Sequence, residues 1–246
     1  MKPILVVGAM SSEINYVIQK LENCKESKLS NYKFYEGTIN GYPVNLIKTE
    51  VGLINAASST TLAIEKCDPC CIINEGTAGG ITPNHHKKDI IIGEEIFNIM
   101  AAKTPYKELG EGSNSLDWNM VSFIEGEDDR RIVLKADEKL MDFIYNLKDE
   151  YKNGNVYKGV IGSADVWNRE KDKLKYLNDK FNVSCEDMES IAVYTVAKNY
   201  NIPAVSIKIM SDNELLGEEY EPAVGMYLQE YFYKILVELT NKLKEE

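Results

Sequence analysis

Two acidic residues flank one helix–strand unit in the last quarter of the chain. Glu189 stands near the start of a segment that we predict to be helical, and Asp212 stands just past Ala204–Met210, an apolar run that we predict to be a buried strand. Ligands of open α/β sheets bind outside the carboxyl ends of the strands, so both carboxylates should reach one region. Such a pair suits acid–base catalysis or sugar binding. We interpret the neighbouring Glu186 and Asp187 more simply, as first-turn acids that complement the helix dipole.

Three other predicted strands end in short turns of small residues. The strand–turn pairs are Ile4–Val7 with Gly8–Glu13, Cys70–Asn74 with Glu75–Gly80, and Val156–Ile161 with Gly162–Asn168. In the first pair, Ser11 or Ser12 would cap a helix and leave Glu13 in its first turn. In the second pair, glycines would let the backbone approach a ligand closely, although a plain structural turn is the simpler interpretation. The chain has no G-x-G-x-x-G and no Walker lysine, which disfavours a dinucleotide or nucleoside triphosphate site.

The remaining pattern predicts an α/β fold in one domain, residues 1–246. We expect a hairpin of Tyr32–Ile39 and Tyr42–Glu50 around Asn40-Gly41, a strand at Asp89–Phe97, and helices at about 137–151, 168–178 and 223–244. Val51–Ala57 should lead into a further helix of small residues that ends at about Lys66. On the last helix the expected core contacts are Met226, Tyr227, Tyr231, Ile235 and Leu239. Residues 98–130 show no periodicity, and loops of this length are usually lids, subunit contacts or disordered.

Composition narrows the range of partners. The formal net charge is −11, which argues against nucleic acids and anionic membranes, because binding them needs clustered lysine and arginine. No apolar run approaches the length that spans a bilayer. The number of cysteines, five, is odd, and the chain begins with a strand rather than a signal peptide. Both features favour a reducing, cytoplasmic setting.

The sequence offers no convincing metal or cofactor site. Cys67 and Cys70 have the C-x-x-C spacing, but no second pair completes a zinc site. The two histidines, His85 and His86, lie in a polar loop and are expected to be solvated rather than catalytic. We therefore expect no metal and no cofactor.

Four strand-end signatures together resemble a known family. They are Gly8-Ala9-Met10…Glu13, Gly76-Thr77-Ala78-Gly79-Gly80, Gly162-Ser163-Ala164-Asp165 and Met188-Glu189…Ser211-Asp212. Their order and spacing resemble the 5′-methylthioadenosine/S-adenosylhomocysteine nucleosidases of the nucleoside phosphorylase superfamily. The resemblance covers most of the chain outside 98–130. It implies a three-layer α/β/α fold with a central mixed, partly barrel-like sheet, and hydrolysis of the N-glycosidic bond of 5′-substituted adenosines. It also implies a homodimer in which the neighbouring subunit helps to form the pocket for the 5′ substituent.

The resemblance also assigns roles. Glu13 would be the base that activates the attacking water, and Asp212 the acid that protonates adenine N7. Adenine is a poor leaving group until it is protonated, and a carboxylic acid does this near neutral pH only where burial raises its pKa. Six further residues would bind the substrate: Glu189 at the ribose hydroxyls, Met188 against the sugar, Thr77 in the pocket wall, Trp167 stacked on the base, the backbone of Asn168 at the adenine edge, and Ser211 beside Asp212 in the Ser-Asp motif.

Several positions depart from the family pattern. Lys208 stands where an arginine often precedes the Ser-Asp pair, and a lysine does not reproduce a planar bidentate contact. The orientation of Glu13 or Glu189 therefore rests on an altered contact. Trp167 is larger than the usual phenylalanine, and Ser11 and Ser12 stand where acids are common.

Two rival functions stay open at this point. A phosphate-dependent purine nucleoside phosphorylase would need cations aimed at an anion, but Asn74-Glu75 stands where related phosphorylases place an arginine. A non-catalytic nucleoside-binding or storage member is disfavoured because Glu13, Glu189 and Asp212 are all present. The sequence does not rank methylthioadenosine, adenosylhomocysteine, 5′-deoxyadenosine or a futalosine-type nucleoside as substrates.

Overall fold

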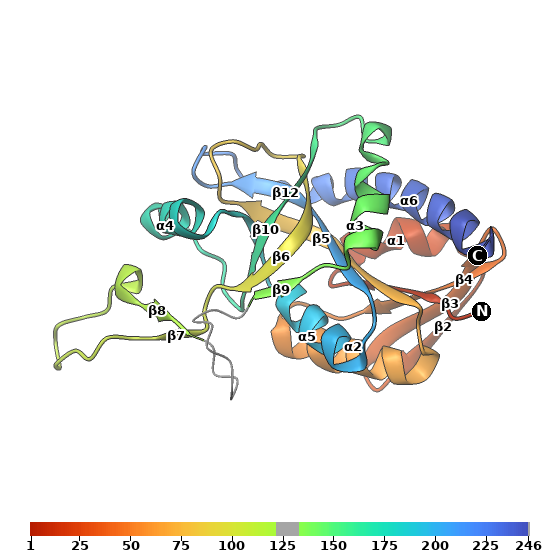
Figure 1. The fold of residues 1–246 in the computed structure, drawn as a ribbon, viewed down its shortest axis with the longest axis horizontal. Helices are drawn as coiled ribbons and strands as arrows, with labels where there is room; N and C mark the ends of the chain where they lie inside the picture. Colours follow the sequence, from red (N-terminus) through yellow and green to blue (C-terminus); the bar gives the residue numbers. More distant parts are fainter. Residues whose placement is uncertain (122–132, 246) are drawn as a thin grey trace.

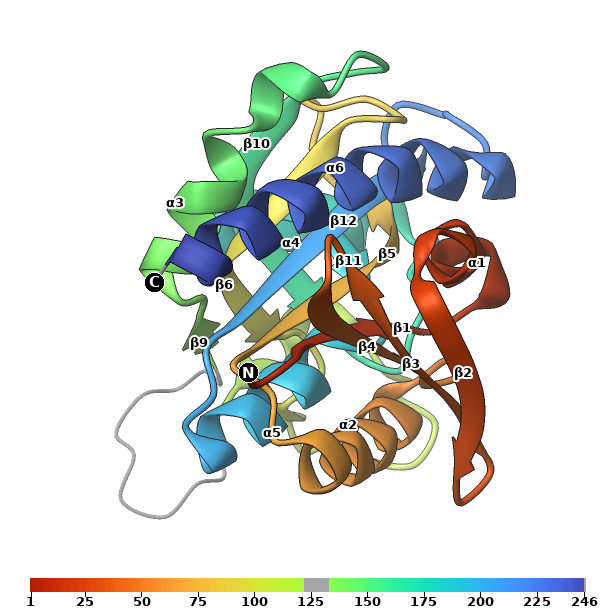
Figure 2. The same cartoon turned by 90° about the vertical axis from the view of Figure 1, so that its right-hand side faces the viewer.

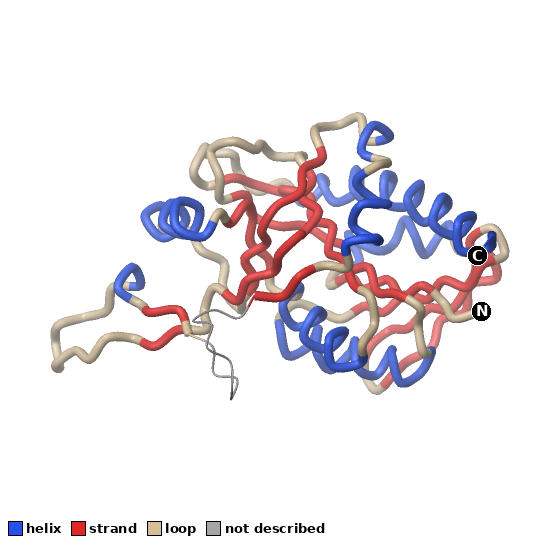
Figure 3. Tube along the Cα trace, in the orientation of Figure 1, coloured by secondary structure: helices blue, strands red, loops and turns tan. Residues whose placement is uncertain are grey.

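The structure is a computed structural model that describes residues 1–121 and 133–245. A ten-stranded sheet comprises β1 (Ile4–Gly8), β2 (Glu22–Leu29), β3 (Tyr32–Ile39), β4 (Tyr42–Lys48), β5 (Cys71–Gly80), β6 (Ile90–Asn98), β9 (Val133–Lys135), β10 (Val156–Ser163), β11 (Val183–Asp187) and β12 (Ala204–Asn213). The helices are α1 (Ser11–Lys20), α2 (Leu53–Cys67), α3 (Glu138–Tyr145), α4 (Lys171–Phe181), α5 (Ser190–Tyr200) and α6 (Gly225–Glu245). Figure 3 shows these helices arranged around the strands. None of the helices in the described part of the chain combines the length and the apolar character needed to cross a membrane.

Five strands of the sheet close into a ring. β5 pairs with β12, β12 with β6, β6 with β10, β10 with β11, and β11 returns to β5. The closing contact is antiparallel and pairs Cys185 with Gly80 and Glu186 with Gly79. β1, β4, β3 and β2 continue from β5 as an open wing. The sheet is therefore mixed and partly barrel-like, which confirms the predicted fold class.

The sequence of β1 explains how the layers form. Successive side chains of a strand point to opposite faces. Ile4 and Val6 pack in the cluster that contains α1, α3 and α6, whereas Leu5 and Val7 pack in the cluster that contains α2 and α5. All four side chains are fully buried, and each burial stabilises the fold by about 1.5–3 kcal/mol. Figure 2 shows α1 and α6 on one side of β1, and α2 and α5 on the other.

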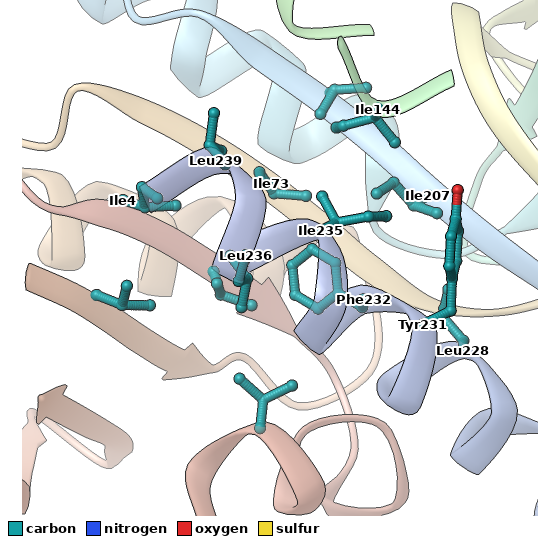
Figure 4. Packing of buried hydrophobic residues seen from close by; sticks show 14 of the residues in the cluster. Ile4, Ile73, Ile144, Ile207, Leu228, Tyr231, Phe232, Ile235, Leu236 and Leu239 are labelled. Atoms are coloured by element: carbon teal, nitrogen blue, oxygen red, sulfur yellow. The ribbon is translucent and has the colours of Figure 1, made fainter. Parts of the chain in front are cut away.

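Helix α6 covers one face of the sheet with an apolar stripe. Figure 4 shows its side chains facing Ile4, Ile73 and Ile207 of the sheet; they are Leu228, Tyr231, Phe232, Ile235, Leu236 and Leu239. Of the predicted core contacts, Tyr231, Ile235 and Leu239 are buried and Tyr227 is partly buried. The prediction for Met226 is wrong, since 44% of this residue is exposed. It precedes the stripe by two positions and so lies on another face of the helix.

The hairpin prediction is confirmed, with both turn residues in the left-handed region. Asn40 has φ 52° and Gly41 has φ 72°, as a type I′ turn requires. The predicted helix 137–151 is shorter than expected, because α3 ends at Tyr145 and a separate 3₁₀ turn, η2 (Lys148–Glu150), follows.

Three corrections concern the segments that carry the predicted chemistry. The expected turn Glu75–Gly80 is a continuation of β5, and Asp212 lies within β12 rather than past its end. The interpretation of Glu186 and Asp187 as first-turn helix acids is wrong, since both belong to β11 and α5 begins only at Ser190.

Residues 99–121 form an arm that projects from the body, seen at the left of Figure 1. It contains two short paired strands, β7 (Ala102–Lys103) and β8 (Asn119–Met120), and a 3₁₀ turn, η1 (Ser115–Asp117). Tyr106 and Leu109 are almost wholly exposed on it. The rest of the irregular region predicted at 98–130, including its acidic patch, lies outside the described residues from position 122 onward.

Candidate active site

One cavity brings most of the predicted site residues together. Its volume is about 210 Å³, and it lies where β1, β5, β11 and β12 end. Seven of the eight predicted residues line it, namely Glu13, Thr77, Trp167, Met188, Glu189, Ser211 and Asp212. Asn168 does not line this cavity, but it donates hydrogen bonds to Glu186 in the cavity wall. Two acids that the sequence analysis set aside, Glu186 and Asp187, also line it.

Glu13 is held rigidly by four donors. Its Oε2 accepts the backbone N–H groups of Ala9 and Met10 at 3.1 and 2.9 Å, and its Oε1 accepts the N–H and hydroxyl of Thr77 at 2.8 and 3.0 Å. The expected cap by Ser11 or Ser12 is not formed: Met10 occupies the N-cap position, and Glu13 reaches back to it from the third position of α1. The acid therefore sits in the cavity wall because it caps its own helix.

Gly76 makes room for this carboxylate. A Cβ atom added to Gly76 would lie 2.8 Å from Glu13 Oε1 and 3.2 Å from Lys208 Nζ. Such close contact with the carboxylate leaves no space for a side chain. The glycine of β5 thus serves close packing of functional groups rather than a turn.

Lys208 and Asp187 form a buried ion pair beneath Glu189. Lys208 Nζ lies 3.0 Å from Asp187 Oδ2 and 4.0 Å from Glu189 Oε2, and both partners of the shorter contact are buried. Asp187 also accepts bonds from the N–H and hydroxyl of Ser190 at the start of α5. Burial opposes the charge on Lys208, but Asp187, Glu189 and Glu13 raise its pKa above the ordinary lysine value. The lysine therefore supplies a permanent positive charge beneath the acids.

Glu189 is the N-cap residue of α5, and one of its carboxylate oxygens accepts a hydrogen bond from the backbone. Its Oε1 accepts the backbone N–H of Gly52 at 3.1 Å. Burial raises the pKa of Glu189 to about 7, against the opposing effect of Lys208. The structure places this carboxylate on the same cavity as Glu13, as predicted, although the ribose-binding role stays a prediction.

Asp212 occupies the other end of the cavity. It is 4% exposed, and its Oδ1 accepts the Ser211 hydroxyl at 2.7 Å. Burial raises the pKa of Asp212, while the bond from Ser211 opposes the shift. A raised pKa keeps more of this carboxyl protonated near neutral pH, which suits a proton donor.

Glu186 also lines the cavity, although its sequence context predicts only a first-turn acid of the helix. Its Oε1 accepts the backbone N–H of Asn168 at 2.8 Å, and its Oε2 accepts the side-chain amide at 2.6 Å. The N–H of Asn168 is thus already engaged, so any contact of its backbone with a base falls to its carbonyl group. A buried acid on a short strand has no signature in a single sequence. The stretch Cys185-Glu186-Asp187 lies in β11, but its acids equally fit the start of the helix that follows.

Aromatic residues border the cavity near Asn168. Trp167 is 56% exposed and packs edge-on against Tyr220, with ring centroids 5.5 Å apart. Both residues line the cavity, as does Val166. Trp167 therefore lies at the rim of the cavity, and its stacking on a base stays a prediction.

Glu75 is a fully buried acid behind the cavity. Neither of its carboxylate oxygens has a hydrogen-bond partner among the described residues. Burial raises the pKa of Glu75 well above its ordinary value, and the charge of Glu13 adds to the shift against the opposing effect of Lys208. The folded protein therefore retains the proton of Glu75 to a higher pH than the unfolded chain does.

This protonation makes stability depend on pH. The unfolded chain releases the proton of Glu75 above about pH 4.3 and the folded chain retains it, so stability is lost as pH rises. Glu75→Gln removes that effect. The difference in unfolding free energy, variant minus wild type, should therefore increase by about 1.4 kcal/mol for each pH unit above about 4.3. The increase ends where the carboxyl of Glu75 also ionises in the folded protein.

Urea unfolding of both proteins at pH 5, 6 and 7, at one protomer concentration, measures this difference. A constant difference across that range would show that Glu75 is ionised beside Lys208 instead. Glu214→Gln, a change of a partly exposed acid, is the matched control and should show no such slope.

In residues 1–121 and 133–245, no cluster of three or more His, Cys, Asp or Glu side chains could hold a metal ion. All five cysteines are free thiols. His86 is exposed and contacts Glu218, but His85 is half-buried and stacks on Tyr157. Only His86 is solvated as predicted, and neither histidine lines the cavity.

The fold and the cavity define an α/β protein with an acid-lined pocket for a small molecule. The chain belongs to the phosphorylase superfamily, whose family model matches residues 3–233. A 5′-methylthioadenosine/S-adenosylhomocysteine nucleosidase of Desulfotalea psychrophila is 31% identical over 209 residues, which cover 84% of this chain and 82% of the relative.

Solved structures share the fold. The Neisseria meningitidis 5′-methylthioadenosine/S-adenosylhomocysteine nucleosidase in complex with methylthio-immucillin-A has a TM-score of 0.78 at 22% identity, covering 97% of this chain and 100% of that one. A futalosine hydrolase mutant of Helicobacter pylori has a TM-score of 0.79 at 18% identity, covering 98% and 100%. At these identities the likeness establishes the fold alone.

Proposed function

We propose that this protein is a nucleosidase that hydrolyses the N-glycosidic bond of 5′-substituted adenosines, such as 5′-methylthioadenosine and S-adenosylhomocysteine. The products are adenine and the 5′-substituted ribose. The observation that carries the proposal is the shared cavity of Glu13, Glu189 and Asp212. The named activity of the Desulfotalea relative supports the same substrate class.

The proposed roles follow from the positions of the three acids. Cleavage develops positive charge on the sugar and negative charge on the departing base. Asp212, with its raised pKa, donates a proton to purine N7, so that the base leaves neutral. Glu13 accepts a proton from the attacking water. Each proton transfer contributes about 10²–10⁴ in rate.

The sugar lies between these two groups. Among the described residues, the backbone donor to Glu189 is the N–H of Gly52, and it binds Oε1. Oε2 accepts the ribose hydroxyls, as a carboxylate oxygen with open lone pairs can. Met188 and Thr77 form the adjacent wall, and Trp167 borders the base. The negative charge of Glu13 and Glu189 also favours the cationic sugar of the transition state.

The charge of the cavity favours water over phosphate as the nucleophile. Among the described residues that line it, five are aspartate or glutamate and none is lysine or arginine. A phosphate anion would meet these carboxylates without a cation on the surface to bind it. The phosphorylase alternative is therefore disfavoured.

Adenine release from 5′-methylthioadenosine tests the proposal. We expect release in phosphate-free buffer at a rate that phosphate does not increase, with the free 5′-methylthioribose as the sugar product. Release that requires phosphate and yields a sugar 1-phosphate would establish a phosphorylase. Binding of the nucleoside without any release would establish the non-catalytic alternative.

We propose further that the protein is a cytoplasmic homodimer. The free thiols of all five cysteines fit a reducing compartment. The projecting arm exposes Tyr106 and Leu109, apolar side chains that a second subunit would cover. In this arrangement the neighbouring subunit completes the pocket for the 5′ substituent. Analytical ultracentrifugation at micromolar protomer concentration tests the proposal, because it distinguishes the mass of a dimer from that of a monomer.

A further inference from the structure

Glu186 is a second carboxylate at the end of the cavity that holds Asp212. Both side chains flank the same residue: a Cβ atom added to Gly79 would lie 3.4 Å from Asp212 Oδ2 and 3.7 Å from Glu186 Cγ. The pairing of β11 with β5 places Glu186 directly opposite Gly79, and β12 pairs Asp212 with the same glycine. The ring closure of the sheet thus brings the two acids together.

We propose that Glu186 makes the site prefer purines with an amino group at position 6 over purines with an oxo group there. This inference rests on the proposed function, in which Asp212 addresses purine N7. N7 and the substituent at position 6 lie on the same edge of a purine. A base whose N7 faces Asp212 therefore presents position 6 to a group beside Asp212, and Glu186 is that group.

The hydrogen bonds of Glu186 determine which substituent it accepts. Asn168 donates to both of its oxygens, which holds the carboxylate in place and leaves it as an acceptor. An ionised carboxylate accepts a bond from a 6-amino group but has no proton for a 6-oxo group. A 6-oxo group facing the Glu186 carboxylate would bury two acceptors with no proton between them. Both groups would then lose the hydrogen bonds that they make in water, and this loss lets polar sites discriminate strongly between substrates.

The preference depends on the charge of Glu186, so the assay pH matters. Burial raises the pKa of Glu186 to about 7, with Asn168 opposing the shift and Asp212 and Asp187 adding to it. A protonated Glu186 would donate to a 6-oxo group and weaken the preference. Measurements at pH 8 keep most of this carboxyl ionised.

The test compares 5′-methylthioadenosine with 5′-methylthioinosine at pH 8 by their kcat/KM values. We expect Glu186→Gln to lower the amino-to-oxo ratio about 10–100-fold, since the glutamine amide can donate to the oxo group. Glu214→Gln neutralises a nearby acid that pairs with Arg169 outside the cavity, and it should leave the ratio unchanged.

A ratio within twofold of the wild-type value in Glu186→Gln would overturn the inference while leaving the nucleosidase proposal intact. Wild-type protein that releases neither base would overturn both. If Glu186→Gln does not fold, Asn168→Ala tests the same claim with Glu186 retained. This variant loses the 2.6 Å bond to Oε2, which opposes the raised pKa of Glu186. The amino-to-oxo ratio of kcat/KM should therefore fall, and an unchanged ratio in Asn168→Ala would also refute the inference.

Discussion

Replacement of Asp212 by asparagine is expected to lower kcat for 5′-methylthioadenosine by about 10²–10⁴, with KM changed by a few-fold at most. Asparagine has nearly the same shape and can still donate a hydrogen bond to N7, but it cannot transfer a proton. Its neighbour Ser211 keeps a partner, because the amide oxygen accepts the 2.7 Å bond that Oδ1 accepts now. The loss should therefore appear in the chemical step.

The pH profile gives an independent readout of the same role. Burial raises the pKa of Asp212, so the acid form persists to higher pH, and wild-type kcat should fall as pH rises through that value. The Asp212→Asn variant should lack this fall, since its side chain does not titrate.

A substrate with an activated leaving group separates proton donation from positioning. A 4-nitrophenyl riboside departs as a stable anion and needs no general acid. Asp212→Asn should retain most of its activity on this substrate. Equal losses on both substrates would show that Asp212 orients the sugar or base instead of donating a proton.

The parts of the fold that sequence reasoning could predict are those with a periodic or turn signal. β1 is apolar on both faces because helices cover both, and such a run predicts a buried strand. The dipeptide Asn40-Gly41 predicts the hairpin turn, in which both residues adopt positive φ. The order of the strand-end signatures predicts the acids Glu13, Glu189 and Asp212 as site residues. Their meeting in one cavity depends on the sheet, which brings together positions about two hundred residues apart in the chain.

Strands without an apolar pattern escaped prediction for physical reasons. β2 is exposed along most of its length, so its residues Glu22–Leu29 carry no alternation. β11 is the opposite case, a strand buried throughout that includes Glu186 and Asp187. Acids are almost never fully buried unless they are paired, and their partners here, Asn168 and Lys208, lie 18 and 21 residues away in the sequence.

The glycine-rich stretch Glu75–Gly80 illustrates a different limit. Glycines predict a turn in isolation, whereas here they belong to a strand that runs between functional side chains. Gly76 leaves space for Glu13 and Lys208, and Gly79 leaves space for Asp212 and Glu186. A glycine required by close packing cannot be distinguished from a turn glycine until the neighbouring strands are known.

The same packing makes Lys208 the residue whose removal should cost most stability. Lys208→Met keeps an unbranched apolar stem of similar length but leaves Asp187 without its partner at 3.0 Å, and Glu189 and Glu13 without the nearby positive charge. Removal of one partner of a buried ion pair costs about 3–5 kcal/mol. We expect a loss of this size in the free energy of unfolding at pH 7, measured by urea denaturation at fixed protomer concentration.

The pH dependence distinguishes lost charge from lost packing. The pKa of Lys208 is raised in the folded protein, so the lysine stays charged and its own contribution is complete below the ordinary lysine pKa of about 10.4. In Lys208→Met, Glu189 loses the nearby positive charge that opposes its raised pKa. The deficit should therefore shrink as pH falls toward 5, where this carboxyl is protonated and needs no cation. Addition of Asp187→Asn should restore part of the loss, since it removes the charge that Lys208 balanced. A deficit that is independent of pH and unaffected by Asp187→Asn would mean that Lys208 fills space and that its charge contributes nothing.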